Sequence, residues 1–132
     1  MRVSYYTTCI GDDLTIKKLA KKISLINYSF VVVQGMARDS GTLNPHIFKK
    51  ENRSQKTKSV DINITIDALR HTYNNSVDGI YLFSGDGDYL PLIKEIMRQG
   101  KQVTIGVFSK GFNSVLQYEC DDFINLDQIF FE

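Results

Sequence analysis

The sequence lacks long apolar runs, cysteine motifs and an excess of charge of either sign. Its longest clean aliphatic run, residues 30–33, is far shorter than the roughly 20 residues that span a bilayer, and the N-terminus has no apolar stretch of signal-peptide length. The two cysteines form no Cys-x-x-Cys pair, and neither histidine has ligand-like spacing to them. We therefore expect a cytoplasmic protein without a membrane segment, a disulfide framework or a zinc site.

Charge is nearly balanced overall, with 16 Lys and Arg against 15 Asp and Glu, but it is unevenly distributed. Residues 36–59 hold six basic and two acidic side chains, whereas the chain from residue 119 onwards has five acidic side chains and no basic one. This segregation suits a protein that guides RNA along a basic rim towards an acidic, metal-binding centre. Taken alone, the basic segment is more simply a solvated surface loop. The candidate RNA-binding residues are Lys49, Lys50, Arg53, Lys56 and Lys58.

The length of 132 residues fits a single domain, and alternating strand and helix patterns predict an α/β fold. We expect three layers, with a mostly parallel sheet covered by helices on both faces. Residues 28–33 read as a buried strand of that sheet, and residues 36–59 as a mobile basic loop. The expected strands are residues 3–8, 28–33, 79–84, 103–108 and 123–126, and the expected helices are about residues 13–26, 61–74, 91–99 and 113–118.

Residues 60–67 contain two competing patterns. Isoleucines at 62, 64 and 66 alternate with polar residues as in a strand, whereas Ile62, Ile66, Leu69 and Tyr73 fit one face of a helix. Two parallel strands need a crossover between them, and this segment is the only candidate between residues 28–33 and 79–84. We therefore predict a helix.

An acidic turn with the sequence Ser-Gly-Asp-Gly-Asp-Tyr, residues 84–89, directly follows an apolar strand. Open α/β sheets bind ligands at the carboxyl ends of their strands. Gly85 and Gly87 can take positive φ, which would let the backbone turn sharply while Asp86 and Asp88 face one crevice. A hard cation such as Mg²⁺ or Mn²⁺ would relieve the repulsion between the two carboxylates. The alternative is an acidic loop in which Asp88 caps the next helix, and the motif alone does not decide between them.

Four segments over about 75 residues carry a family resemblance. They are Lys-Ser-Val-Asp at 58–61 with Asp-Ala-Leu at 67–69, the acidic turn with Pro-Leu at 91–92, Gly-Lys-Gln-Val at 100–103, and Ser114, Leu116 and Asp-Asp-Phe at 121–123. In this order they resemble the NYN family, the LabA-like branch of the PIN-like metal-dependent ribonucleases. In the fourth segment the spacing from Ser to Leu is one residue shorter than in the family.

The resemblance implies a PIN-like fold and hydrolysis of RNA phosphodiester bonds with Mg²⁺ or Mn²⁺ as cofactor. It implies that Asp61, Asp86 and Asp88 hold the metal and are the catalytic residues, and that Ser84 shapes the acidic pocket. Each residue also has a simpler explanation: Asp61 is well placed to stabilise a helix N-terminus, and Lys58 is an ordinary surface lysine.

The start of the chain departs from the family, whose first strand ends in an Asp and supplies a leading metal ligand. Residues 2–8 resemble the second strand of the family instead. Three explanations remain: the true start lies upstream, a partner chain supplies the strand in a homodimer, or residues 3–8 occupy the vacant place. In the last case Asp12 or Asp13 would stand in as ligand.

The sequence therefore favours a metal-dependent ribonuclease that acts on single-stranded or structured RNA. The main alternative is a catalytically inactive RNA-binding or protein-binding module of the same fold. A phosphohydrolase of the haloacid dehalogenase type ranks last, because its early Asp-x-Asp nucleophile is missing and only Asp12 and Asp13 stand nearby without an intervening residue.

Overall fold

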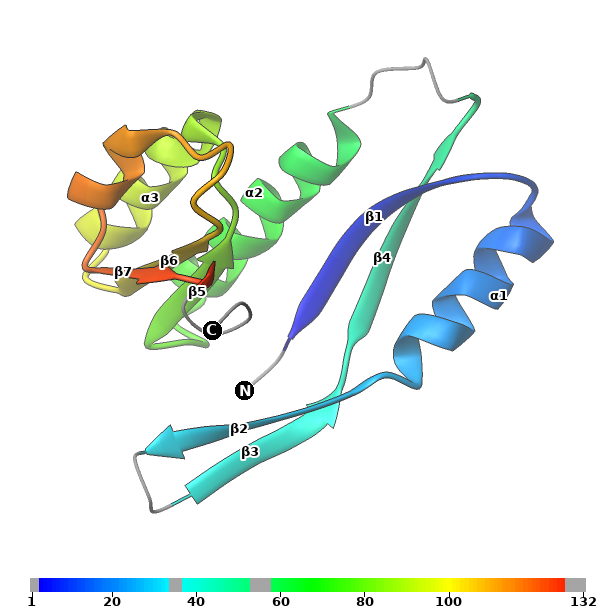
Figure 1. The fold of residues 1–132 in the computed structure, drawn as a ribbon, viewed down its shortest axis with the longest axis horizontal. Helices are drawn as coiled ribbons and strands as arrows, with labels where there is room; N and C mark the ends of the chain where they lie inside the picture. Colours follow the sequence, from blue (N-terminus) through cyan, green and yellow to red (C-terminus); the bar gives the residue numbers. More distant parts are fainter. Residues whose placement is uncertain (1–2, 34–36, 53–57, 128–132) are drawn as a thin grey trace. The chain divides into compact units, whose positions relative to one another are not determined.

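A computed structural model describes residues 3–33, 37–52 and 58–127 (Figure 1). The chain forms two compact units, Met1–Ile62 and Asn63–Glu132. Within the described ranges, three of the four strand pairings are parallel and helices connect the strands, which confirms the α/β fold class. Among these residues, none of the helices combines the length and apolarity needed to span a bilayer.

The first unit is built on a parallel pair of strands, β1 (Ser4–Ile10) and β4 (Asn44–Lys50), which lie in register from Ser4 opposite Asn44 to Ile10 opposite Lys50. Parallel strands need a crossover, and residues 11–43 supply it. In the middle of the pair the rings of Tyr6 and His46 stack, with centroids 4.4 Å apart and planes 11° from parallel.

Helix α1 (Asp13–Ser24) packs against β4 and begins at an aspartate cap. Asp12 Oδ1 accepts hydrogen bonds from the backbone N–H and the hydroxyl of Thr15, both at 2.8 Å. These bonds satisfy donors that the first turn leaves without partners inside the helix. The helix itself was predicted, over about residues 13–26.

The connection between α1 and β4 corrects two sequence predictions. Strand β2 (Asn27–Val33) pairs antiparallel with β3 (Ala37–Thr42), so residues 28–33 are not a strand of a parallel sheet. The predicted loop at 36–59 is also wrong where β3 and β4 replace it, whereas residues 36 and 53–57 of that segment lie outside the described residues. Pairing with β2 and β1 makes these strands, and such long-range pairing leaves little periodicity in the sequence.

Helix α2 (Ser59–Tyr73) confirms the choice of helix over strand for residues 60–67. The predicted apolar face is only partly right. Leu69 packs against the core of the second unit with Ile64 and Ala68, whereas Ile62, Ile66 and Tyr73 are each more than half exposed. The face of α2 that packs against the core is therefore rotated from the face that the isoleucine spacing predicted.

The second unit contains a parallel three-stranded sheet in the order β5 (Gly79–Phe83), β6 (Gln102–Val107) and β7 (Asp122–Asn125). Ile80 and Leu82 of β5 pack towards the core, while Tyr81 and Phe83 on its other face are 60% and 63% exposed. In the described part of the chain β5 pairs with β6 alone, so no described strand pairs with its outer edge.

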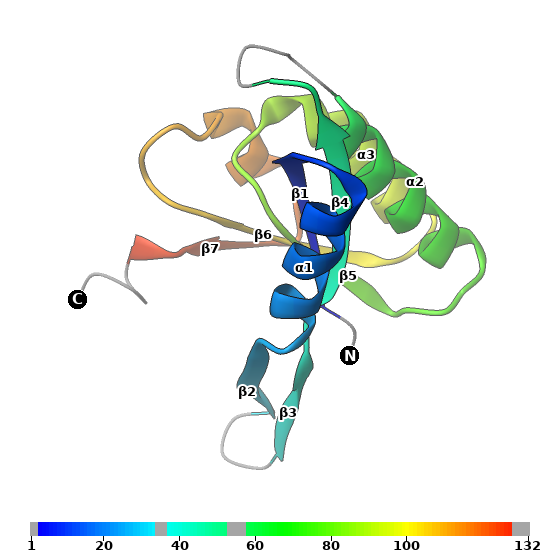
Figure 2. The ribbon, with the colours of Figure 1, turned by 90° about the vertical axis from the view of Figure 1, so that its right-hand side faces the viewer.

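Helix α3 (Leu90–Arg98) supplies the core of the second unit, and Figure 2 shows α2 and α3 on the same side of the sheet. Ile93 and Ile96 of this helix are buried against Val103 and Ile105 of β6. Pro91 lies in the first turn, where its missing N–H costs nothing, and Gly100 follows the end of the helix with a φ of +82°. The acidic turn thus lies between β5 and a helix that is buried against the sheet.

Candidate functional site

The acidic turn lies at the carboxyl end of β5 and is held by its own hydrogen bonds. Asp86 is the N-cap of a short 3-10 helix, η1 (Gly87–Tyr89), and its Oδ1 accepts from the backbone N–H of Asp88 at 2.9 Å. The Asp86 N–H in turn donates to Ser84 Oγ at 3.2 Å. Both aspartates are exposed, whereas Tyr89 is buried in the core and anchors the turn. The backbone thus fixes the Asp86 carboxylate at the sheet edge where α/β folds place their ligands.

The two glycines of this turn serve close packing, which corrects the expectation of positive φ. Neither has a positive φ. A Cβ at Gly85 would lie 2.7 Å from Phe112 Cβ and 2.8 Å from Phe112 Cα, and one at Gly87 would lie 2.9 Å from Asn113 Cγ. Such distances are shorter than carbon atoms of two side chains tolerate. Glycine is therefore needed at these positions so that the segment at residues 112–113 can approach the turn, and not because the backbone requires a positive φ.

The segment after β6 forms the second wall of the site, and sequence analysis missed it. The N–H of Asn113 donates to Gly85 O at 2.9 Å, and residues 111–113 line a shallow groove together with Gly85, Asp86 and Gly87. Asn113 also caps η2 (Ser114–Tyr118) by accepting from the N–H of Val115 at 3.0 Å. The available signal was topological, because the carboxyl ends of adjacent parallel strands share one edge of the sheet.

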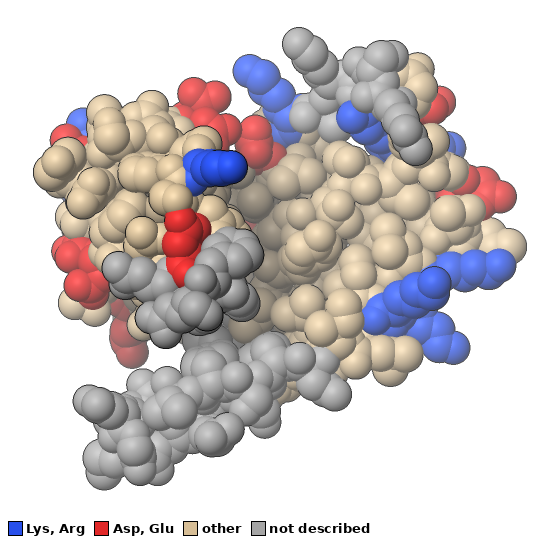
Figure 3. Space-filling model, viewed as in Figure 1, with Lys and Arg blue, Asp and Glu red and all other residues tan. Residues whose placement is uncertain are grey.

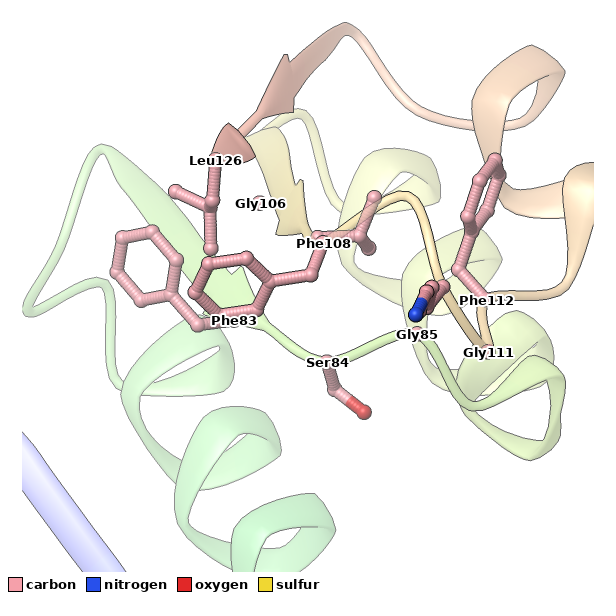
Figure 4. A pocket seen from close by; sticks show the side chains of 10 residues that line it. Phe83, Ser84, Gly85, Gly106, Phe108, Gly111, Phe112 and Leu126 are labelled. Carbon is pink, nitrogen blue, oxygen red and sulfur yellow. The ribbon is translucent and has the colours of Figure 1, made fainter. Parts of the chain in front are cut away.

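A hollow of about 180 Å³, which we call the aromatic hollow, adjoins this groove through Gly85 (Figure 4). Its lining includes Phe83, Ser84, Phe108, Lys110 and Phe112. Figure 4 shows the rings of Phe83 and Phe108 at one end, with Phe112 beyond Gly85 at the other. Lys110 therefore places a positive charge at the carboxyl edge of the sheet. The charged residues predicted at this edge from the sequence were all acidic.

Asp61 lies in the first turn of α2, in the first unit, whereas Asp86 and Asp88 lie in the second. The N–H of Ile62 donates to Lys58 O at 2.9 Å, so the helical bonds begin at the Lys58 carbonyl. A carboxylate in a first turn is stabilised by the helix dipole, which gives Asp61 a structural role whether or not it binds metal. Its assignment as third metal ligand stays a prediction.

The acidic turn offers oxygen donors of the kind that Mg²⁺ and Mn²⁺ prefer. No group of three or more His, Cys, Asp or Glu side chains within the described ranges is arranged to hold a metal ion. Mg²⁺, however, is commonly bound by one or two carboxylates together with waters and substrate phosphates. Within the same ranges Asp86 Oδ2 accepts no hydrogen bond, because only Oδ1 is used in the turn. The donor set of Asp86 and Asp88 thus fits a hydrated, hard cation.

Three other acidic residues have structural partners. Asp121 Oδ2 accepts from the Val103 N–H at 2.8 Å and ties β7 to the start of β6, while Asp67 pairs with Arg70 at 3.0 Å. Asp12 is engaged at the start of α1, as described above. The interpretation of Asp12 as a substitute ligand therefore finds no support in its geometry.

The basic residues are concentrated in the first unit, which has eleven Lys and Arg against five Asp and Glu, whereas the second unit has five against ten. Figure 3 shows basic side chains gathered over α1, whose lysines occupy positions 17, 18, 21 and 22. Lys49 and Lys50 end β4, and Lys49 lies near enough to Asp12 to favour the charged form of that carboxylate. Lys58 is exposed, whereas Arg53 and Lys56 lie outside the described residues.

Comparisons with known proteins assign the family. The fold resembles the crystal structure of a protein of unknown function from Vibrio parahaemolyticus RIMD 2210633, with a TM-score of 0.62 and 20% identity over 96% of this chain and 68% of the other. An uncharacterized protein of Methanocaldococcus jannaschii is 31% identical over 71 residues, which is 54% of this chain and only 30% of that protein. The model of the NYN domain matches residues 3–127. The chain therefore belongs to the NYN domain family, which has a PIN-like nuclease fold.

Proposed function

We propose that this NYN domain is a metal-dependent ribonuclease that hydrolyses RNA phosphodiester bonds. The observation that carries the proposal is the acidic turn: Asp86 and Asp88 lie at the carboxyl end of a parallel strand, in a backbone held by hydrogen bonds and by the close approach of Gly85 to Phe112. A site that must bind a cation in one geometry needs this kind of rigid support. Membership of the NYN family, with its PIN-like nuclease fold, supports the same reaction class.

The proposed roles follow from the geometry of the turn. Asp86 presents Oδ2 while Oδ1 remains bound to the Asp88 N–H, so its carboxylate stays oriented. Asp88 adds a second exposed carboxylate, and Ser84 holds the Asp86 N–H. Asp61 is the proposed third ligand. A bound Mg²⁺ or Mn²⁺ would lower the pKa of a coordinated water and stabilise charge that develops on the phosphate.

The basic first unit would bind the RNA backbone in this proposal. Lys49, Lys50 and Lys58 would contact phosphates, with Arg53 and Lys56 as further candidates. Such contacts give affinity without sequence specificity.

Cleavage of a short fluorescein-labelled single-stranded RNA, with Mn²⁺ varied, tests this function. Asp86→Asn is the sharpest variant, because an amide oxygen still accepts the Asp88 N–H and keeps the turn, while the negative charge is lost. We expect it to raise the Mn²⁺ concentration for half-maximal rate about tenfold or more. Asp78→Asn is the matched control, since Asp78 is an exposed acid at the amino end of the same strand.

Equal Mn²⁺ dependence for Asp86→Asn and Asp78→Asn would contradict the proposal. RNA binding with a steep salt dependence but no cleavage at any Mn²⁺ concentration would identify the inactive binding module instead.

A further inference from the structure

The aromatic hollow is separate from the carboxylates but continuous with their groove. Gly85 lines both, and Ser84, whose hydroxyl holds the Asp86 N–H, lines the hollow. A chain that passes the acidic turn would meet this hollow next. The whole feature lies within the second unit, Asn63–Glu132.

Phe83 provides a flat apolar surface at this place. It is the last residue of β5, and its side chain is 63% exposed although parallel sheets usually bury both faces. Its ring lies across Gly106, the residue opposite it on β6: a Cβ at Gly106 would lie 2.5 Å from Phe83 Cδ1 and 2.6 Å from Cε1. The absent side chain at Gly106 thus lets the Phe83 ring lie against the sheet, and Figure 4 shows the Phe108 ring next to it.

The same hollow also has a positively charged residue in its lining. Lys110, on the segment after β6, lines the same hollow, and it is exposed. An aromatic face with an adjacent cation complements a nucleotide, whose base stacks while its phosphate meets the ammonium group. An apolar peptide would gain nothing from Lys110, so the charge favours a nucleic acid as occupant.

The size of the hollow limits what it can hold. Its volume of about 180 Å³ is below the roughly 300 Å³ of the smallest pockets that enclose drug-sized ligands. A single planar ring fits, whereas the bases of a duplex stay stacked in the helix and would not reach it.

We propose that the aromatic hollow stacks one unpaired base of single-stranded RNA on Phe83, with Lys110 at the adjoining phosphate. The inference deepens the proposed nuclease function and rests on it. It adds to that function a stacked nucleotide next to the bond at Asp86.

Binding measured without cleavage tests the inference. The full chain carrying Asp86→Asn is titrated with a short labelled oligouridylate, and with copies in which one nucleotide at a time is abasic. At one position the abasic copy is expected to bind roughly tenfold more weakly, because stacking on one aromatic side chain is lost. Phe83→Leu, which keeps an apolar side chain without a ring, should abolish this sensitivity, and Phe83→Tyr should retain it.

Tyr81→Leu is the matched control, since Tyr81 is 60% exposed on the same strand and face but does not line the hollow. It should leave the abasic sensitivity unchanged. If Phe83→Leu also leaves it unchanged, the inference is overturned. A change in oligomeric state on Phe83→Leu, without a change in RNA affinity, would overturn it as well and assign the face to contacts between copies.

Cleavage by the chain with Asp86 intact separates this inference from the proposed function. If the chain cleaves RNA but Phe83→Leu leaves the abasic sensitivity unchanged, the stacked nucleotide is rejected and the nuclease function is kept. If Phe83→Leu abolishes the abasic sensitivity but the chain does not cleave RNA, the stacked nucleotide is kept and the nuclease function is rejected.

Discussion

At the scale of single residues, hydrogen bonds from Thr15 determine the behaviour of Asp12. The backbone N–H and then the hydroxyl of Thr15 lower the pKa of the Asp12 carboxyl from its ordinary value of 3.8. A carboxyl whose pKa is lower in the folded state contributes stability at pH values above its ordinary pKa, and the contribution is lost as the pH falls through the folded value. The start of α1 should therefore weaken in acid.

We predict that the Thr15 amide loses protection below about pH 3.8 while the rest of α1 is still folded. Asp12→Asn should remove this pH dependence, because asparagine caps as well as aspartate but does not titrate. NMR titration of the Asp12 carboxyl and of the Thr15 amide checks both statements. An Asp12 pKa at or above the ordinary value would contradict them.

Gly85 gives a second prediction at this scale. In Gly85→Ala the new methyl would meet Phe112 at 2.7 Å, and relieving the clash would move the turn that carries Asp86. We expect a loss of about 1–3 kcal/mol in the free energy of unfolding, as for other overpacked sites, together with weaker metal-dependent cleavage.

Gly100→Ala is the control for this prediction. Its φ of +82° is strained for alanine, but no atom lies within 4 Å of the added methyl. It should cost about 1–2 kcal/mol of unfolding free energy with cleavage unchanged. Urea unfolding and cleavage rates measured on both variants separate strain from displacement of the site; equal cleavage by the two would show that the Gly85 contact does not position Asp86.

At the scale of elements, α3 was predictable because its signals are local. Pro91, the apolar spacing of Leu92, Ile93 and Ile96, and the closing glycine all lie within a few residues of one another. Strand β3 was not predictable, since Arg-Asp-Ser-Gly has little strand propensity and the strand exists through its pairing with β2. Helix α3 can thus be predicted from neighbouring residues, whereas β3 forms only by pairing with another strand, and the local sequence gives no sign of that pairing.

The site divides in the same way. The position of Asp86 and Asp88 after a strand followed from the local sequence. The packing of Phe112 and Asn113 against Gly85 and Gly87 could not be inferred from the local sequence, because it joins two turns more than 20 residues apart. For this reason the glycines were predicted to serve a positive φ, whereas they serve close packing. Lys110 was missed for the same reason.

Core packing by α3 gives a third prediction. Ile93 is fully buried, whereas Ile66 on α2 is 53% exposed. Ile93→Ala should lower the free energy of unfolding by about 2–5 kcal/mol through lost contacts and a cavity. Ile66→Ala should stay within about 0.5 kcal/mol. Urea denaturation of the two variants checks this, and similar losses would show that Ile66 is covered in solution.

At the scale of the whole molecule, near-neutral net charge conceals two units of opposite sign. The first carries a net charge of +6 and the second −5. An RNA chain should therefore be attracted to the first unit, and this attraction should weaken as salt screens it.

The fourth prediction concerns salt. Lys49→Gln combined with Lys50→Gln should lower the slope of the logarithm of RNA affinity against the logarithm of salt concentration by up to about two, if each lysine meets one phosphate. Lys94→Gln, an exposed lysine on α3 in the acidic unit, should leave the slope unchanged. Fluorescence anisotropy over a series of salt concentrations measures both; equal slopes for all three proteins would exclude the end of β4 from the RNA interface.

Pairing of β5 with β6 alone, among the strands that the structure describes, has a consequence for isotope exchange. Backbone N–H groups along a strand alternate in direction, so only every second amide of Gly79–Phe83 faces β6. Deuterium should therefore enter β5 in an alternating pattern, fast at amides that face outwards and slow at those between them. On β6, which is flanked by strands on both sides, uptake should be slow at successive amides. A uniformly slow β5 would reveal that another strand lies along its outer edge in solution.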